Sequence, residues 1–147
     1  MIIIRLGYSM GCSEKNESID EKFHVFYISG PMSGVVRYNF PLFDSVADHL
    51  RGHGAHVINP ADLSRRIQLD GKEHSWGEFI GKDLQEMRTM NVKFPGRCVL
   101  VQLPGWSESD GAVAEHALAV KWGWRVLLAF DVVPLSASGD LNRPPRR

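Results

Sequence analysis

Apolar, strand-like runs alternate with helix-periodic segments along most of this chain. Four short apolar segments predict strands: 24–29, 55–58, 99–103 and 125–130. Three segments with apolar residues at helical spacing predict helices: 41–53, 75–90 and 110–123. Because strands that alternate with helices usually form parallel sheets, the sequence predicts an α/β fold with a parallel sheet covered on both faces.

The ends of the predicted helices carry specific residue signals. Asn39 is expected to cap the first helix, with Pro41 in its first turn. Ser75 and Glu78 have the spacing of a capping box at the start of the second helix. The residues 61–74 before it are a polar stretch in which no helix or strand is predicted.

The regular pattern divides the chain into three parts. Residues 1–23 are predicted to be an N-terminal extension with one possible extra strand at 2–4. Residues 134–147 are predicted to be an irregular tail. Residues 24–133 are expected to form one domain, since a chain of 147 residues suits a single hydrophobic core.

The charge balance and the absence of long apolar runs indicate which partners are not expected for this protein. The 17 Lys and Arg residues equal the 17 Asp and Glu residues, and a basic cluster occurs only at 143–147. A nucleic-acid polymer is therefore not an expected partner. No apolar run approaches the length of about 18 residues that a membrane span requires, so no membrane association is expected and the predicted location is the cytoplasm.

Cysteine and histidine spacing gives no metal or redox motif. Cys12 and Cys98 are not part of a C-x-x-C pair, and the six histidines show no ligand spacing with acids. We expect no metal and no cofactor. Cys98 begins an apolar strand and is predicted to be a buried thiol.

Three loops are predicted to meet at the carboxyl ends of the strands, where α/β folds bind their ligands. They are residues 29–38, 59–63 and 104–110. The glycines of the first loop allow close approach of the backbone to a ligand, while its serines donate either to a ligand or within a local turn. The predicted binding residues of the first two loops are Ser29, Gly30, Pro31, Met32, Gly34 and Asn59.

Two carboxylates fall on apolar helix faces. Asp83 lies between Ile80 and Met87 on one stripe, and Glu115 shares a face with Ala119. An acid in such a position is costly unless it is paired. Each is therefore either a structural acid held by an arginine or by backbone N–H groups, or a functional group.

The start of the third helix has the composition of an anion site. Ser107, Ser109 and Gly111 gather where free backbone N–H groups would point at a ligand. Asp110 is either part of this site or a plain N-cap. Trp106, in the same loop, is either a stacking platform or a packing residue.

Four stretches of the sequence together resemble the nucleoside 2-deoxyribosyltransferase-like superfamily: "YISGPMSG", "NFPLFDSVADHLRGHGAHVINPAD", "WGEFIGKDLQEM" and "LPGWSESDGAVAEHALAVKWGWRVL". The resemblance covers roughly residues 24–130 and is closest to the DUF4406-type subfamily of phages and prophages, a domain of unknown function. It implies a Rossmann-like (flavodoxin-like) three-layer sandwich with a parallel sheet of four to five strands. It also implies a homodimer or higher homo-oligomer in the cytoplasm of a bacterium or phage-infected cell.

The resemblance further implies cleavage of the N-glycosidic bond of a nucleoside, deoxynucleoside or 5′-monophosphate, by hydrolysis or deoxyribosyl transfer. The superfamily's nucleophilic glutamate falls on Glu115, its second carboxylate on Asp83 and its tyrosine on Tyr27. The serine that binds the 5′-phosphate in the nucleotide hydrolases falls on Ser109, followed by Gly111. One carboxylate that traps the sugar cation, with a second acid that assists the leaving base, is coherent chemistry for this reaction.

The sequence departs from the superfamily pattern at two places. Residues 91–97 lack the aspartate that members commonly carry before the third strand, and Pro31 replaces a phosphate-binding serine. Two other functions stay open. One is a non-catalytic nucleotide-binding sensor of phage or prophage origin, and the other is a structural phage protein that uses Trp106, Trp122 and Trp124 for packing.

Overall fold

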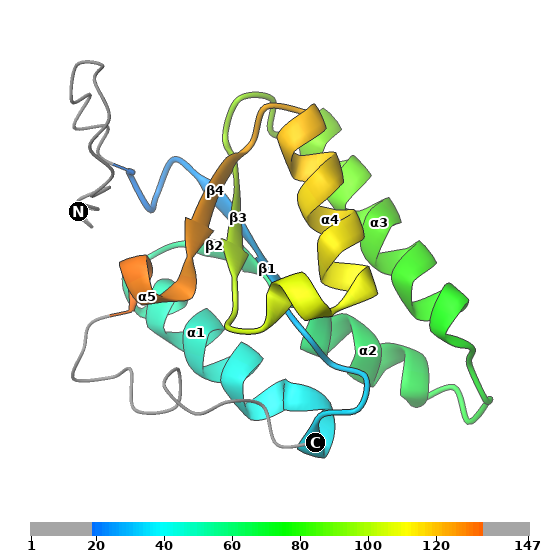
Figure 1. Cartoon of the computed structure of the whole chain (residues 1–147). Coiled ribbons are helices and arrows are strands. Elements are labelled where there is room, and N and C mark those ends of the chain that lie inside the picture. The colour runs from blue at the N-terminus through cyan, green and yellow to red at the C-terminus, as the bar shows by residue number, and fades with distance from the viewer. Residues whose placement is uncertain (1–18, 134–147) are drawn as a thin grey trace.

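Four parallel strands form the centre of the part of the chain that the computed structural model describes, residues 19–133 (Figure 1). They are β1 (Val25–Ser29), β2 (His56–Ile58), β3 (Cys98–Gln102) and β4 (Arg125–Leu128). The strand order is β2-β1-β3-β4 and every pairing is parallel. This is the flavodoxin-like order of doubly wound folds, and it confirms the predicted α/β fold.

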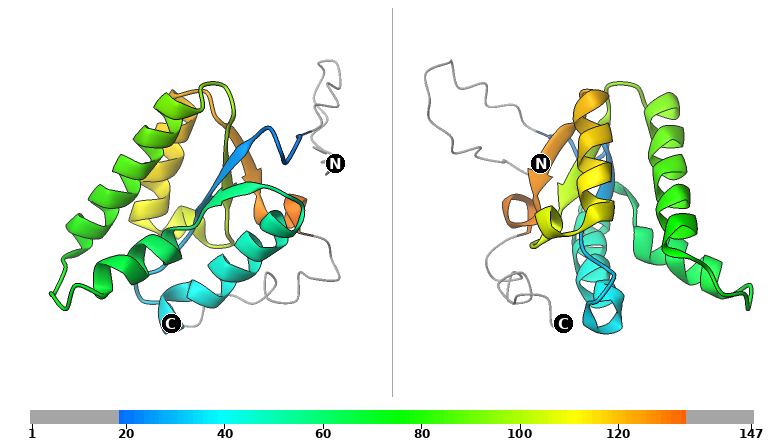
Figure 2. Two further views of the ribbon diagram at one scale, coloured as in Figure 1. Left: turned by 180° about the vertical axis from the view of Figure 1, so that it is seen from behind. Right: turned by 45° about the vertical axis from the view of Figure 1, so that its right-hand side comes forward.

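Helices cover both faces of this sheet. They are α1 (Phe40–Gly52), α2 (Pro60–Gln68), α3 (Trp76–Lys93), α4 (Asp110–Lys121) and the short α5 (Ala129–Val132), with single turns η1 (Val36–Asn39) and η2 (Trp106–Glu108). The long helices α3 and α4 run side by side, as both views in Figure 2 show.

Successive side chains of the central strands pack alternately into two separate hydrophobic cores. Phe26 packs in one core with Leu50 of α1. Val25, its neighbour in β1, packs in the other core with Met87 of α3 and Ala119 of α4. Because successive strand residues point to opposite faces, the sheet is buried between two helical layers, as expected for a three-layer sandwich.

The central strands end at the same level. Ser29 of β1 is paired with Gln102 of β3, so the loops after both strands leave the sheet together. η2 and the start of α4 lie at this arrowhead end of the sheet (Figure 1). The chain runs from β1 to one neighbour and later returns on the other side, which makes this end the topological switch point where such folds bind ligands.

Helix α2 is the main difference from the sequence-based expectation. No element was predicted in the polar stretch 61–74, but most of its residues belong to this helix. Asn59 caps it, since its Oδ1 accepts a hydrogen bond from the amide of Ala61 at 3.0 Å. The helix is short and polar. Beyond its first turn, Ile67 is the apolar side chain that it buries, and one residue cannot show the apolar spacing that predicts a helix.

Two predictions at element ends were wrong. The chain turns into α5 after Leu128 instead of continuing as a strand to Phe130. Asn39 precedes α1 but makes no side-chain cap, because it has a left-handed backbone (φ 59°) and its Nδ2 donates to the carbonyl oxygen of Pro31 at 3.0 Å. That bond ties the start of α1 to the loop after β1.

The capping box at the start of α3 is confirmed. Ser75 Oγ accepts from the amide of Glu78 at 3.2 Å, and Glu78 Oε2 accepts from the amide of Ser75 at 2.7 Å. The helix runs to Lys93, three residues beyond the predicted end at Met90. The cap fixes where the helix starts and therefore which face of its second turn carries Asp83.

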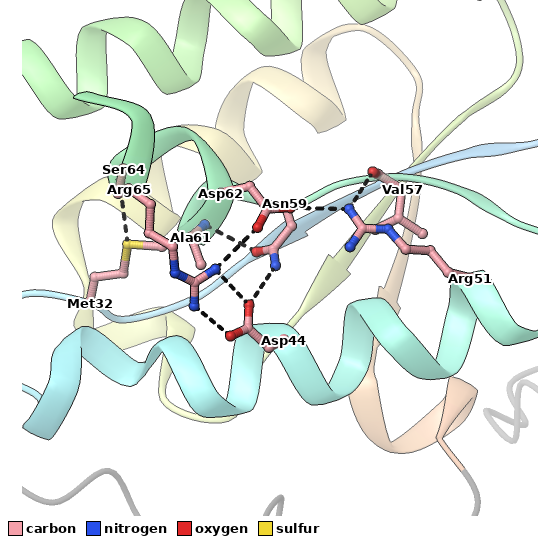
Figure 3. Close-up of polar contacts among 9 residues, drawn as sticks. All are labelled: Met32, Asp44, Arg51, Val57, Asn59, Ala61, Asp62, Ser64 and Arg65. Atoms are coloured by element: carbon pink, nitrogen blue, oxygen red, sulfur yellow. Dashed lines mark hydrogen bonds and ion pairs between the residues drawn. The ribbon is translucent and has the colours of Figure 1, made fainter. Parts of the chain in front are cut away.

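A polar network joins α1 to α2 (Figure 3). Arg65 Nη1 lies 3.0 Å from Asp44 Oδ1 and 3.1 Å from Asp62 Oδ1. Asn59 Nδ2 donates to Asp44 Oδ1 at 3.1 Å, and Arg51 Nη2 contacts Asp62 Oδ2 at 3.2 Å. These polar contacts link α2 to α1, and Ala61 of α2 is buried in the same core as Val46 and Ala47 of α1.

Some predictions concern residues outside the described range of 19–133. They are the strand at 2–4, Cys12, the basic cluster at 143–147 and the tail from 134. Of the predicted extension 1–23, Ile19 is described and is buried in the core with Leu50. Within 19–133, no helix has the length and apolar character needed to cross a membrane.

We predict that Asn59→Ala lowers the free energy of unfolding by about 1–2 kcal/mol, because it removes both the α2 cap and the bond to Asp44. Asn59→Ser, which keeps a capping oxygen, should lose less. Chemical denaturation of the three proteins measures the difference. Equal stability of all three would show that Asn59 does not hold α2 in place.

Candidate functional site

A cavity of about 290 Å³ lies at the carboxyl end of the sheet. Its walls come from the loop after β1, from η1 and the start of α1, from α2, from the beginning of α3 with the connection before it, and from the beginning of α4. The lining residues are Gly30, Met32, Ser33, Tyr38, Phe40, Phe43, Pro60, Ser64, Gln68, His74, Trp76, Phe79, Ile80, Asp83, Ser109, Gly111, Ala112 and Glu115. Both predicted acids therefore line one cavity.

Glu115 is the buried acid of the cavity, with only 4% of its surface exposed. The hydroxyl of Tyr27 donates to its Oε1 at 2.9 Å, and the hydroxyl of Ser29 donates to its Oε2. The two donors are two residues apart on β1, so they point to the same face of the sheet. No residue within 19–133 forms an ion pair with Glu115, so neutral hydroxyl groups, rather than an arginine, hold this carboxylate.

The two acids of the cavity have shifted pKa values. Burial raises the pKa of Glu115 to about 7, although the hydrogen bonds from Ser29 and Tyr27 lower it. Burial, and then the negative charge of Glu115, raise the pKa of Asp83 to about 8. As pH rises, Glu115 therefore loses its proton first and Asp83 keeps its own. Around neutral pH the pair holds one carboxylate and one carboxylic acid.

Tyr27 remains a hydrogen-bond donor throughout this range. Its side chain is fully buried beneath the cavity, and burial raises its pKa well above the usual value, with a further contribution from the charge of Glu115. A tyrosine that stays protonated orients the carboxylate without competing for its charge.

The start of α4 lies against the cavity through Ser109 and Gly111. Ser109 is the N-cap, since its Oγ accepts from the amide of Ala112 at 3.4 Å, so the alternative of Asp110 as the cap is excluded. A Cβ on Gly111 would lie 3.3 Å from Ile80 Cδ1, which shows how closely α3 approaches this end of α4.

Gly30 allows the loop after β1 to pass close to the sheet. A Cβ at this position would lie 2.7 Å from Leu103 Cβ, so no larger residue fits without a shift of the backbone. The amide of Leu103 donates to the carbonyl of Ser29 at 2.8 Å and holds the two loops together. The close approach brings the loop to the cavity wall.

The structure brings together only part of the predicted site. Gly30, Met32, Asp83, Ser109, Gly111 and Glu115 line the cavity, and Tyr27 and Ser29 contact Glu115 from beneath it. A second hollow of about 330 Å³, which shares Ser33, Trp76 and Ser109 with the first, is lined by the predicted residues Pro31, Gly34 and Asp110. The remaining predicted residues, Asn59, Trp106 and Ser107, line neither.

Two of these three residues have other contacts. Asn59 caps α2 and donates to Asp44. Trp106 stacks on His116, with ring centroids 4.6 Å apart and an angle of 19° between the rings. One face of the indole is thus occupied by His116 and is not offered to the cavity.

Sequence reasoning missed the walls that α1 and α2 provide. Tyr38, Phe40 and Phe43 line the cavity from one side, and Ser64 and Gln68 line it from α2. The α2 residues gave no signal because the helix itself was not predicted. Trp76 and Phe79, in the first turn of α3, also line the cavity.

Cys98 is the buried thiol that the sequence predicted, and burial raises its pKa to about 11. Among the residues that the structure describes, no group of three or more His, Cys, Asp or Glu side chains is arranged to hold a metal ion.

The fold and the site define a Rossmann-like α/β domain in which the buried Glu115 and the partly buried Asp83 line one crevice at the carboxyl end of the sheet. A family model described as "Domain of unknown function (DUF4406)" matches residues 24–128, and the chain belongs to this family. A search of curated proteins finds no match.

We predict that Asp83→Asn stabilises the protein at alkaline pH. Because the pKa of Asp83 rises on folding from 3.8 to about 8, the folded protein binds more protons than the unfolded chain in this interval, and wild-type stability is lost as pH rises through it. The variant lacks this loss. Its melting temperature should match that of the wild type near pH 4 and exceed it increasingly up to pH 8.

Thermal unfolding between pH 4 and pH 9 measures this difference. Asp48→Asn, on the exposed face of α1, is the control and should show no such trend. A constant difference between Asp83→Asn and wild type over the whole range would contradict the burial of an ionisable Asp83.

Proposed function

We propose that this protein cleaves the N-glycosidic bond of a nucleoside, a deoxynucleoside or a nucleoside 5′-monophosphate, with Glu115 as the nucleophile. The observation that carries the proposal is the pair of hydroxyl groups, from Tyr27 and Ser29, that hold the Glu115 carboxylate in the same cavity as Asp83. The resemblance of the sequence to the nucleoside 2-deoxyribosyltransferase-like superfamily supports the same assignment.

The reaction follows from the charge states of the two acids. Departure of the base leaves positive charge on the sugar ring, and a Glu115 oxygen forms a bond to the anomeric carbon as the bond from that carbon to the base nitrogen breaks. The electron pair leaves with the base, which takes a proton from Asp83. Water or a second base then attacks the anomeric carbon, the bond from that carbon to the Glu115 oxygen breaks, and its electron pair returns to the Glu115 carboxylate. Asp83, now a carboxylate, accepts the proton that the attacking nucleophile releases.

Other residues position the reacting groups. Tyr27 and Ser29 are positioning residues, because they touch Glu115 rather than the substrate. The free amides at the start of α4, with Ser109 and Gly111, would bind the 5′ end of the sugar as a hydroxyl or a phosphate. The proposal includes a homo-oligomer, as the superfamily resemblance implies, and a cytoplasmic location, where free nucleotides are found.

We predict that Glu115→Ala abolishes base release, because no other group of the cavity is held in place to attack the anomeric carbon. A panel of nucleosides and 5′-monophosphates, with and without a second base as acceptor, is followed by chromatography of the free base. Asp48→Ala, an exposed acid on α1, is the matched control and should keep full activity. If the wild type binds members of the panel but releases base from none, the protein is a sensor and the enzymatic proposal is wrong.

We also predict a narrow pH optimum between about pH 7 and about pH 8. Activity requires an ionised Glu115, whose pKa is about 7, and a protonated Asp83, whose pKa is about 8. Asp83→Asn should remove the alkaline limb of the profile and lower kcat by about 10²–10⁴-fold, with the smallest loss for the best leaving bases. An alkaline limb that persists in this variant would exclude Asp83 as the acid.

A further inference from the structure

The two ends of the cavity differ in chemistry. Helix α4 follows β3 and helix α2 follows β2, and these two strands lie on opposite sides of β1. The cavity at the end of β1 therefore has Glu115 and Ser109 of α4 on one side, and Ser64 and Gln68 of α2 on the other. The α4 side is assigned to the sugar, whereas the α2 side has no assigned ligand.

Ser64 has an unusually weak hydrogen-bond partner for a buried hydroxyl. The residue is 5% exposed, and its one side-chain hydrogen bond within residues 19–133 is a contact of 3.9 Å to the sulfur of Met32 (Figure 3). A thioether is a weak acceptor, while buried polar groups normally have good partners. The hydroxyl therefore gains a stronger bond whenever a polar ligand atom enters this side of the cavity.

Gln68 lies four residues after Ser64 on the same helix face and lines the same cavity. Its carboxamide carries both donors and an acceptor, and in the described part of the chain it makes no side-chain hydrogen bond. Ser64 and Gln68 together present a short row of neutral hydrogen-bonding groups to the cavity.

An aromatic wall stands beside this row. The guanidinium of Arg65 in α2 lies 4.8 Å from the centre of the Phe40 ring, which places Phe40 at the α2 side of the cavity. Phe43 lines the cavity from the next turn of α1. Because the Arg65 guanidinium covers one face of the Phe40 ring, only the rest of this aromatic wall is open to the face of a planar ligand, whose polar edge would meet the neutral polar groups of α2.

We propose that Ser64 and Gln68 bind the hydrogen-bonding edge of the nucleobase and set the base preference of the protein. The inference rests on the proposed function. In a nucleoside the base on C1′ and the 5′ group on C4′ diverge from the two carbons that flank the ring oxygen, so a 5′ end at the start of α4 directs the base toward α2. Glutamine side chains bind base edges through paired donor and acceptor contacts.

The test measures binding separately from base release. In a Glu115→Gln background, which lacks the nucleophile, calorimetry gives the affinities for 2′-deoxyadenosine, 2′-deoxyinosine, 2′-deoxycytidine and 2′-deoxyuridine. Adding Gln68→Leu should weaken the preferred nucleoside about tenfold, as expected for loss of hydrogen bonds to the base.

Gln68→Glu sharpens the test. An ionised carboxylate only accepts hydrogen bonds, so this change should weaken about tenfold the binding of bases to which the Gln68 carboxamide donates, while bases that only donate to it keep their contact, and the affinity ratio among the four nucleosides should change accordingly. Gln85→Leu and Gln85→Glu, at an exposed position of α3 outside the cavity, are the matched controls and should leave both affinity and ratio unchanged.

The outcomes separate this inference from the proposed function. If the wild type releases base but the Gln68 variants bind all four nucleosides like the parent, base recognition by α2 is wrong and the glycosidic chemistry stands. If the Gln68 variants change the affinities but the wild type releases no base, the base site stands and the chemistry fails. If no nucleoside binds, the wild type is titrated with the four free bases, and absence of binding there also overturns the inference.

Discussion

The site depends on holding one carboxylate in a buried position without a cation. The two oxygens of Glu115 are held by hydroxyl groups of Tyr27 and Ser29, which share a face of β1 because they are two residues apart. The strand itself is buried on both sides, so these donors have little freedom to move. A neighbouring arginine would have fixed the carboxylate as firmly, but it would also have neutralised the charge that a nucleophile needs.

The burial of these acids lowers the stability of the fold but gives both groups pKa values near neutrality. Burial raises the pKa of both Glu115 and Asp83 toward neutrality, which means that the fold disfavours their charged forms. A cavity lined by well-paired or apolar groups would be more stable, and such a conflict between stability and arrangement is typical of functional sites. The surrounding fold compensates through the two cores that enclose β1 and β3.

Polar contacts and the buried Ala61 together position the α2 side of the cavity. Asp44, Asn59 and Arg65 link α2 to α1, and the Phe40 ring lies under the Arg65 guanidinium. On the other side, Gly30 lets the loop after β1 pass within contact of Leu103. The cavity is thus enclosed by segments whose positions depend on one another, although they lie far apart in the sequence.

Features of the fold that depend on neighbouring residues were predictable from the sequence. The strands and long helices follow from apolar periodicity, the α3 cap from the spacing of Ser75 and Glu78, and the two acids from their places on apolar faces. Helix α2 and the contacts of Asn59 and Trp106 were not predictable, because long-range partners decide them. The sequence by itself determined the strands, the long helices and the two candidate acids. Only the tertiary structure decided which of those groups share a cavity, because hydrogen bonds and pKa shifts arise from residues that the fold brings together.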